Sequence, residues 1–142
     1  MTSGAKKLAG PAFAGDDGAP DLALRAELAA PTESLIELLR SARLLVAVVA
    51  VPEELGVAGA DKRTHLAAVS MINASGAKGL LAFTGLDSLT RWDPIARPVP
   101  VLGAQAAGAA IADGSVALVI DIAGPHRYVV TSTALTSLAA AD

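Results

Sequence analysis

The chain contains no cysteine among its 142 residues. Disulfides, thiolate nucleophiles and cysteine metal sites are therefore excluded together, and the absence fits a cytoplasmic protein. Aromatic residues make up only 3% of the sequence, although 53% of it is hydrophobic. We therefore expect a core of alanine, valine and leucine, in which stability depends on close backbone packing rather than on a few large side chains.

Long apolar runs and clusters of positive charge are also missing. The longest clean apolar run, Leu44–Val51, is far shorter than the roughly 20 residues that a transmembrane helix needs. The formal net charge is -3, and lysine and arginine do not cluster. Because nucleic acids and anionic membranes both attract concentrated positive charge, we expect neither as a partner.

Residues 1–20 are rich in glycine, alanine and aspartate without apolar periodicity, which predicts a disordered tail before one domain over residues 21–142. Helices are predicted over residues 21–29 and 32–43. Leu44–Val51 is apolar throughout, which is typical of a strand covered on both faces. A loop over residues 53–63 precedes a predicted strand over residues 66–73. Small and glycine residues at 74–79 then predict a hairpin that returns along residues 80–84.

At Thr84 the hydrophobic period changes from that of a strand to that of a helix. Thr84 and Asp87 fit a capping box, and Leu86, Leu89 and Trp92 follow at steps of three. We expect this stripe to be core, so that truncating Trp92 to alanine would cost about 3–5 kcal/mol.

Two prolines mark the next segment, Arg97–Val101, as an edge strand or an extended stretch, because proline cannot donate a backbone hydrogen bond. An alanine-rich helix at 103–113, strands at 115–121 and 127–131 and a helix at 132–141 complete the prediction. The fold class is therefore α/β (α+β), a single domain with a mixed, mostly antiparallel sheet of about five strands flanked by helices.

A catalytic or metal-binding set of residues is not recognisable. His65 and His126 each stand alone, without a second ligand at helical spacing, and a Gly-x-Ser-x-Gly motif is absent. Gly103 and Gly108 have the glycine spacing of a phosphate loop, but alanines follow where lysine and a hydroxyl residue are needed. We therefore expect no catalytic residues, no metal and no cofactor.

Candidate binding residues lie on two predicted loops. Asp61 and Lys62 fall between two strands, whereas Trp92, Asp93 and Arg97 follow a third strand. If the strands are neighbours, these loops could meet and offer cations, an acid and an aromatic ring. In the alternative interpretation Asp93 caps the helix, Arg97 pairs with Asp93 or Asp61, and Trp92 belongs to the core.

The same segments carry a family resemblance. Ala60-Asp61-Lys62, Leu81–Thr84, the run Leu89–Pro100 and Asp121–Pro125 resemble the N-terminal domain of the SseB-like proteins, especially their actinobacterial branch. Members usually have serine after the Phe-Thr pair, where this chain has Gly85, and this difference argues against a hydroxyl-based role there. The resemblance implies a soluble cytoplasmic bacterial α/β domain without established catalytic residues.

Taken together, these observations lead us to expect a non-enzymatic interaction module that binds a protein partner or itself. The alternative is a small-molecule or anion sensor with a loop-lined pocket formed by Asp61, Lys62 and Arg97.

Overall fold

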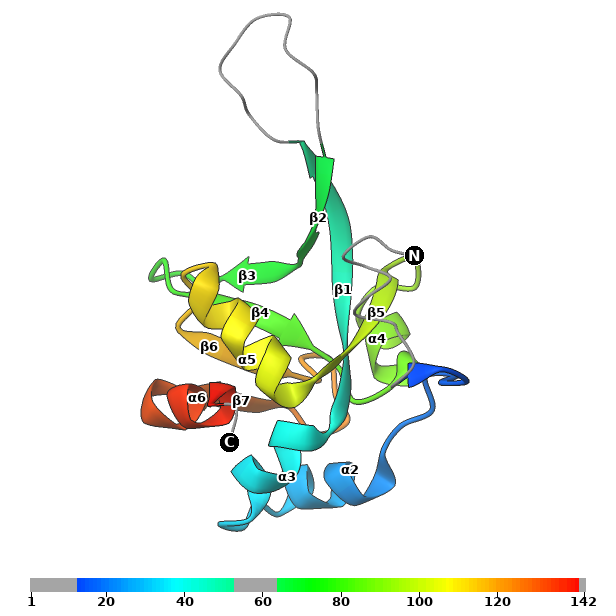
Figure 1. Ribbon diagram of the computed structural model, residues 1–142, viewed down its shortest axis with the longest axis vertical. Coiled ribbons are helices and arrows are strands. Elements are labelled where there is room, and N and C mark those ends of the chain that lie inside the picture. Colours follow the sequence, from blue (N-terminus) through cyan, green and yellow to red (C-terminus); the bar gives the residue numbers. More distant parts are fainter. Residues whose placement is uncertain (1–12, 53–63, 141–142) are drawn as a thin grey trace, which may run out of the picture.

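The computed structural model describes residues 13–52 and 64–140, whose strands form two sheets (Figure 1). The three-stranded sheet has the order β2-β1-β5, and the four-stranded sheet has the order β3-β4-β6-β7. The strands are β1 (Arg43–Pro52), β2 (Thr64–Ala68), β3 (Ser70–Ile72), β4 (Lys78–Ala82), β5 (Arg97–Leu102), β6 (Ala117–Ile120) and β7 (Tyr128–Thr131).

The predicted fold class, a mixed α/β domain, is confirmed. The only parallel pairing among the named strands is between β4 and β6, and the other neighbours are antiparallel. The two sheets are joined at Leu45 and Phe83, whose backbones exchange two hydrogen bonds of 2.8 Å each. The strands thus belong to two connected sheets, which the sequence patterns had not separated.

The described helices are α2 (Leu22–Ala29), α3 (Leu35–Ser41), α4 (Leu86–Trp92), α5 (Gly103–Ala112) and α6 (Ser132–Ala139). α5 and α6 lie against one face of the four-stranded sheet, which we call its inner face (Figure 1). The inner-face core is aliphatic, as expected, and its buried members include Leu80, Leu118 and Val130 from the sheet and Ala107 and Leu138 from the helices.

α5 approaches its neighbour as closely as its composition indicates. A Cβ atom built on Gly103 would lie only 1.8 Å from the carbonyl oxygen of Leu39 in α3. Only glycine allows the two backbones to come this close. Ala106, Ala107 and Ala110 are buried on the same helix, so small side chains permit the tight packing.

β5 is an edge strand, as its prolines predicted. It pairs only with β1 in the described sheet, with Pro98 opposite Ala47 and Pro100 opposite Leu45. By contrast, the single strand predicted over residues 66–73 is two strands that belong to different sheets. They are separated by Val69, whose backbone N–H donates to Ala47 and whose carbonyl accepts from Leu81.

The described structure includes residues 13–20, which were predicted to belong to a disordered tail. Residues 1–12 lie outside the described residues, but residues 13–20, which we call the N-terminal segment, pack on the domain. The Gly18 carbonyl accepts a 2.7 Å hydrogen bond from the backbone N–H of Leu86. Asp16 forms a 2.9 Å ion pair with Arg43, and this contact was missed because its partner is distant in sequence.

Candidate functional site

The predicted binding surface is only partly within the described residues. Asp61 and Lys62 lie outside them, so the proposed meeting of the two loops concerns a part of the chain that is not described. Trp92 is half-buried, with its ring 5.6 Å from that of Phe83. It packs against a small buried cluster that contains Leu81, Phe83 and Leu89, whereas Leu86 is 39% exposed and does not belong to the predicted buried stripe.

Asp93 and Arg97 do not pair in the described part of the chain. Asp93 ends α4, and its carboxylate accepts a 3.1 Å hydrogen bond from the backbone N–H of Ile95. Arg97 is exposed at the first position of β5. The three described members of the predicted set therefore lie at the end of a helix and at the start of an edge strand.

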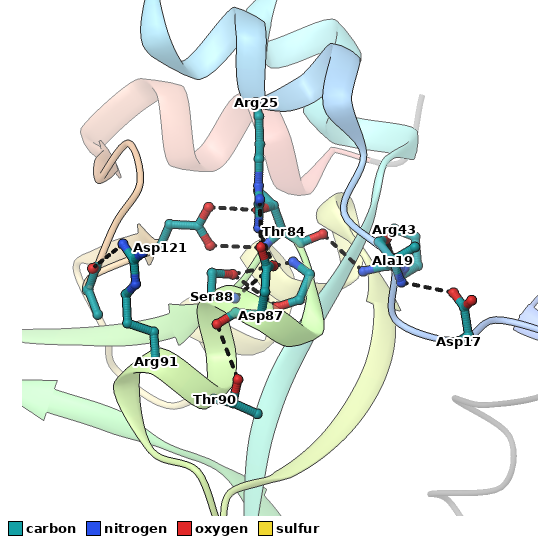
Figure 2. A network of polar contacts seen from close by, with 12 residues as sticks. Asp17, Ala19, Arg25, Arg43, Thr84, Asp87, Ser88, Thr90, Arg91 and Asp121 are labelled. Carbon is teal, nitrogen blue, oxygen red and sulfur yellow. Dashed lines mark hydrogen bonds and ion pairs between the residues drawn. The ribbon is translucent and has the colours of Figure 1, made fainter.

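A polar network that sequence reasoning missed lies at the ends of the parallel strands β4 and β6 (Figure 2). We call Arg25, Thr84, Asp87 and Asp121 the Arg25–Asp121 network. The fully buried Asp121 carboxylate accepts from the Thr84 backbone N–H at 2.8 Å and from the Thr84 hydroxyl at 2.6 Å. The same hydroxyl oxygen accepts from Arg25 Nε at 2.7 Å, so one threonine connects a carboxylate and a guanidinium.

Arg25 completes the network by a two-pronged ion pair with Asp87. Its Nη1 donates to Asp87 Oδ2 at 2.9 Å, and its Nη2 donates to Oδ1. These hydrogen bonds hold the pKa of Asp87 below its ordinary value and raise the pKa of Arg25. Both groups therefore stay charged over a wider pH range than they would in an unfolded chain.

The predicted capping box of Thr84 and Asp87 is wrong, because other residues occupy these positions at the start of α4. The N-cap of α4 is Gly85, and the reciprocal contact comes from Ser88, whose Oγ accepts from the Gly85 backbone N–H at 3.3 Å. Thr84 does not cap because Asp121 and Arg25 engage its hydroxyl. A Cβ on Gly85 would lie 2.9 Å from Pro20 Cα, so the N-terminal segment also favours glycine at this position.

The Arg25–Asp121 network joins elements rather than forming a reactive centre. It ties α2 to the segment after β4 and to the segment after β6, and Arg43 of β1 donates to the Thr84 carbonyl at 3.1 Å. Asp121 itself has a left-handed backbone with φ of 52°, a conformation that aspartate tolerates better than most residues. Because the network's side chains engage one another, its geometry supports a structural role.

A second feature lies on the outer face of the four-stranded sheet, opposite α5 and α6. Met71, Gly79, Ala117 and Thr131 are register partners across the four strands. Their neighbours Leu80, Leu118 and Val130 belong to the inner-face core. Since successive side chains of a strand point to opposite faces, this row lies on the outer face.

This row forms the floor of a cavity of about 440 Å³, which we call the outer-face pocket. Within the row Gly79 and Ala117 have the smallest side chains, and Val119 and Val129 add further apolar side chains to the lining. Met71 and Val129 are 44% and 46% exposed. Lys78 and Arg127 are the charged residues of the lining, and no aspartate or glutamate belongs to it.

Sequence reasoning missed the outer-face pocket because it depends on strand pairing. Each of its strands taken singly is a short apolar run, and such runs do not show which face a helix covers. One signal was available, namely Gly79 at the start of the strand after the hairpin. A glycine inside a strand often marks close approach of another group.

Another cavity, of about 400 Å³, lies where the N-terminal segment meets Arg43. Its charged side chains, Asp16 and Arg43, pair with each other, so they do not offer an open binding group.

Metal-binding and membrane features were also sought over residues 13–52 and 64–140. In these ranges no group of three or more histidine, cysteine or acidic residues could hold a metal ion. None of the helices described there combines the length and apolar character needed to span a bilayer.

Comparison with known families gives one finding. A family model described as the SseB protein N-terminal domain matches residues 22–137. Searches of curated proteins and of solved structures give no match.

Proposed function

This chain belongs to the SseB protein N-terminal domain family, and we propose that it is a non-enzymatic interaction module. In this proposal it acts in the bacterial cytoplasm and binds a protein partner, or itself, through the outer face of the four-stranded sheet. The actinobacterial type, suggested by the resemblance of residues 60–62, 81–84, 89–100 and 121–125, is part of the same proposal.

One observation carries the proposal: β6 is apolar at every position, and the outer face of its sheet, which α4 covers around Leu81, leaves apolar side chains exposed beside β6. Such continuous apolar strands are typical of sheets buried on both faces. Around β6, Val116 and Val129 are 55% and 46% exposed. A partner that covers this face would remove these side chains from water, which is the main driving force of most protein association.

Electrostatics support a binding role over a catalytic one. The buried carboxylate of Asp121 is committed to Thr84, and Asp87 is committed to Arg25. A general base or nucleophile needs an accessible atom beside a substrate. The sensor alternative depends on Asp61 and Lys62, which lie outside the described residues, and no observation favours it over the sheet surface.

The test compares two exposed apolar side chains. Val129→Glu places a charge on the outer face, whereas Ile95→Glu places the same charge on a residue that is 85% exposed and does not line the pocket. The tagged chain and both variants are expressed in the source cells, crosslinked and captured, and partners are quantified by mass spectrometry. Sedimentation velocity measures self-association of each protein.

We expect the wild-type chain and the Ile95→Glu variant to share a partner or a dimer that the Val129→Glu variant loses. Circular dichroism melts verify that both variants fold. If a folded Val129→Glu variant keeps every interaction of the wild-type chain, the outer face is not the binding surface and the proposal fails.

A further inference from the structure

We propose that the outer-face pocket binds an extended segment of a partner protein that is both apolar and acidic. An aliphatic side chain of the segment would lie against the aliphatic groups around Gly79, and a neighbouring carboxylate would pair with Arg127. This inference rests on the proposed function and specifies the chemistry of the partner.

The floor of the pocket is apolar and closely packed. A Cβ on Gly79 would lie only 3.0 Å from Val119 Cγ2 and 3.7 Å from Ala117 Cβ, so the Val119 side chain already lies close over Gly79. Glycine weakens the interior of a strand, and this close approach of Val119 accounts for its presence here. The groups around Gly79 are aliphatic, which favours an aliphatic occupant of the pocket above them.

The charged residues of the pocket lining, Lys78 and Arg127, indicate that the bound segment also carries a carboxylate. Lys78 Nζ donates to the Asp113 carbonyl at 2.9 Å and lies 3.6 Å from its carboxylate, so this cation already has a partner. Arg127 is exposed and lies one residue before β7. It forms no ion pair with the described residues. Its planar guanidinium is suited to bidentate binding of a carboxylate.

Two other occupants fit less well. A second copy on this face would offer the same cations, Lys78 and Arg127, and its pocket lining has no acidic side chain to pair with them. The cavity volume of about 440 Å³ falls within the usual range for a small bound group. A short segment fits this volume, whereas a folded domain would contact only its rim.

The experiment uses a displayed library of random twelve-residue peptides, selected on the full chain. Enriched peptides are synthesised with a fluorophore, and their affinities are measured by fluorescence anisotropy. The chain variants are Arg127→Glu and Gly79→Ala, and the matched control is Arg97→Glu. Arg97 is an exposed arginine at the start of a strand in the other sheet.

We expect the enriched peptides to combine aspartate or glutamate with nearby valine, isoleucine or leucine. Arg127→Glu should weaken binding at least roughly threefold, since an exposed ion pair is replaced by repulsion. Replacing the acidic residue of the peptide by lysine should restore affinity to this variant. Arg97→Glu should stay within about twofold of the wild-type chain, and Gly79→Ala should weaken binding because its methyl group displaces the Val119 side chain, which lines the pocket.

Enrichment of peptides without acidic residues would overturn the inference, as would affinities that Arg127→Glu leaves unchanged. A failure to enrich any peptide would also overturn it. In each of these cases the proposed function is judged separately by the loss of cellular partners in the Val129→Glu variant. Competition by a small carboxylate such as octanoate at similar affinity would point to a small-molecule ligand and would also contradict the inference.

Discussion

Asp121 binds Thr84 twice, through the backbone N–H at 2.8 Å and through the hydroxyl at 2.6 Å, although 37 residues separate them. The two residues follow β4 and β6, which are parallel neighbours. Since Asp121 is fully buried, these hydrogen bonds replace those that its carboxylate oxygens would make with water.

Thr84→Val tests these hydrogen bonds with little change in shape. The variant leaves one Asp121 oxygen and Arg25 Nε without the threonine hydroxyl, and we expect a loss of roughly 2–3 kcal/mol in unfolding free energy. Urea melts followed by circular dichroism measure the loss. The control is Thr90→Val, an exposed threonine on α4 that should change stability by less than about 0.5 kcal/mol. Equal effects at both positions would contradict the structural role of the network.

The pair of Arg25 and Asp87 predicts a specific pH dependence. Asp87 has a folded-state pKa below its ordinary value of 3.8. Its contribution to stability is therefore fully present above pH 3.8 and is lost as the pH falls through the lower, folded-state pKa. The Asp87 side chain is 58% exposed, so we expect a contribution of at most about 1 kcal/mol.

Asp87→Asn should remove this dependence. The difference in unfolding free energy between the wild-type chain and the variant should be largest near neutral pH and should shrink below pH 3.8. Urea melts at several pH values measure it. A difference that stays constant from neutral to acidic pH would show that charge is not involved.

Two glycines of α5 predict opposite results. Gly103→Ala would place a methyl group 1.8 Å from the Leu39 carbonyl oxygen, and overpacking against a rigid backbone should cost about 3 kcal/mol or more. Gly108 has nothing within 4 Å of an added Cβ, so Gly108→Ala should stabilise the helix by about 0.5–1 kcal/mol. Thermal melts of the two variants should therefore move in opposite directions. A tolerated Gly103→Ala would show that α3 and α5 can separate easily.

We expect Trp92→Ala to cost less than the sequence alone predicts. Trp92 is half-buried and packs on Phe83, so we expect a loss of about 2–3 kcal/mol, below the range of about 3–5 kcal/mol for buried aromatic residues. Trp92→Phe should recover part of it by keeping the ring contact. Circular dichroism melts need no tryptophan signal and can measure both variants. A loss below about 0.5 kcal/mol would place Trp92 among surface residues.

Local patterns were sufficient for much of the fold. The unbroken apolar run Leu44–Val51 predicted β1, and the prolines of Arg97–Val101 predicted an edge strand. The helix predicted over residues 21–29 is α2, and its first predicted residue, Asp21, is the N-cap, whose carboxylate accepts from the Leu24 backbone N–H. In each case the residues that determine the local structure are neighbours in the sequence. The structure can therefore be predicted without knowing which distant segments pack together.

The features that could not be predicted depend on distant partners. Thr84 has the pattern of an N-cap, but it binds Asp121 and Arg25 instead. Val69 looks like the middle of one strand, yet it lies between two strands of different sheets. The outer-face pocket likewise appears only when four strands are placed in register, which no single segment specifies.

The two backbone hydrogen bonds between Leu45 and Phe83 have a consequence for the dynamics of the domain. Leu45 lies in the central strand of one sheet and is bridged to Phe83, directly after β4 of the other sheet. Separating the sheets would expose Leu45 and Phe83, which are almost fully buried. The backbone amides of Leu45 and Phe83 should therefore exchange with deuterium only when the whole domain opens, at one common rate. The two sheets would then act as a single cooperative unit, despite their separate hydrogen-bond ladders.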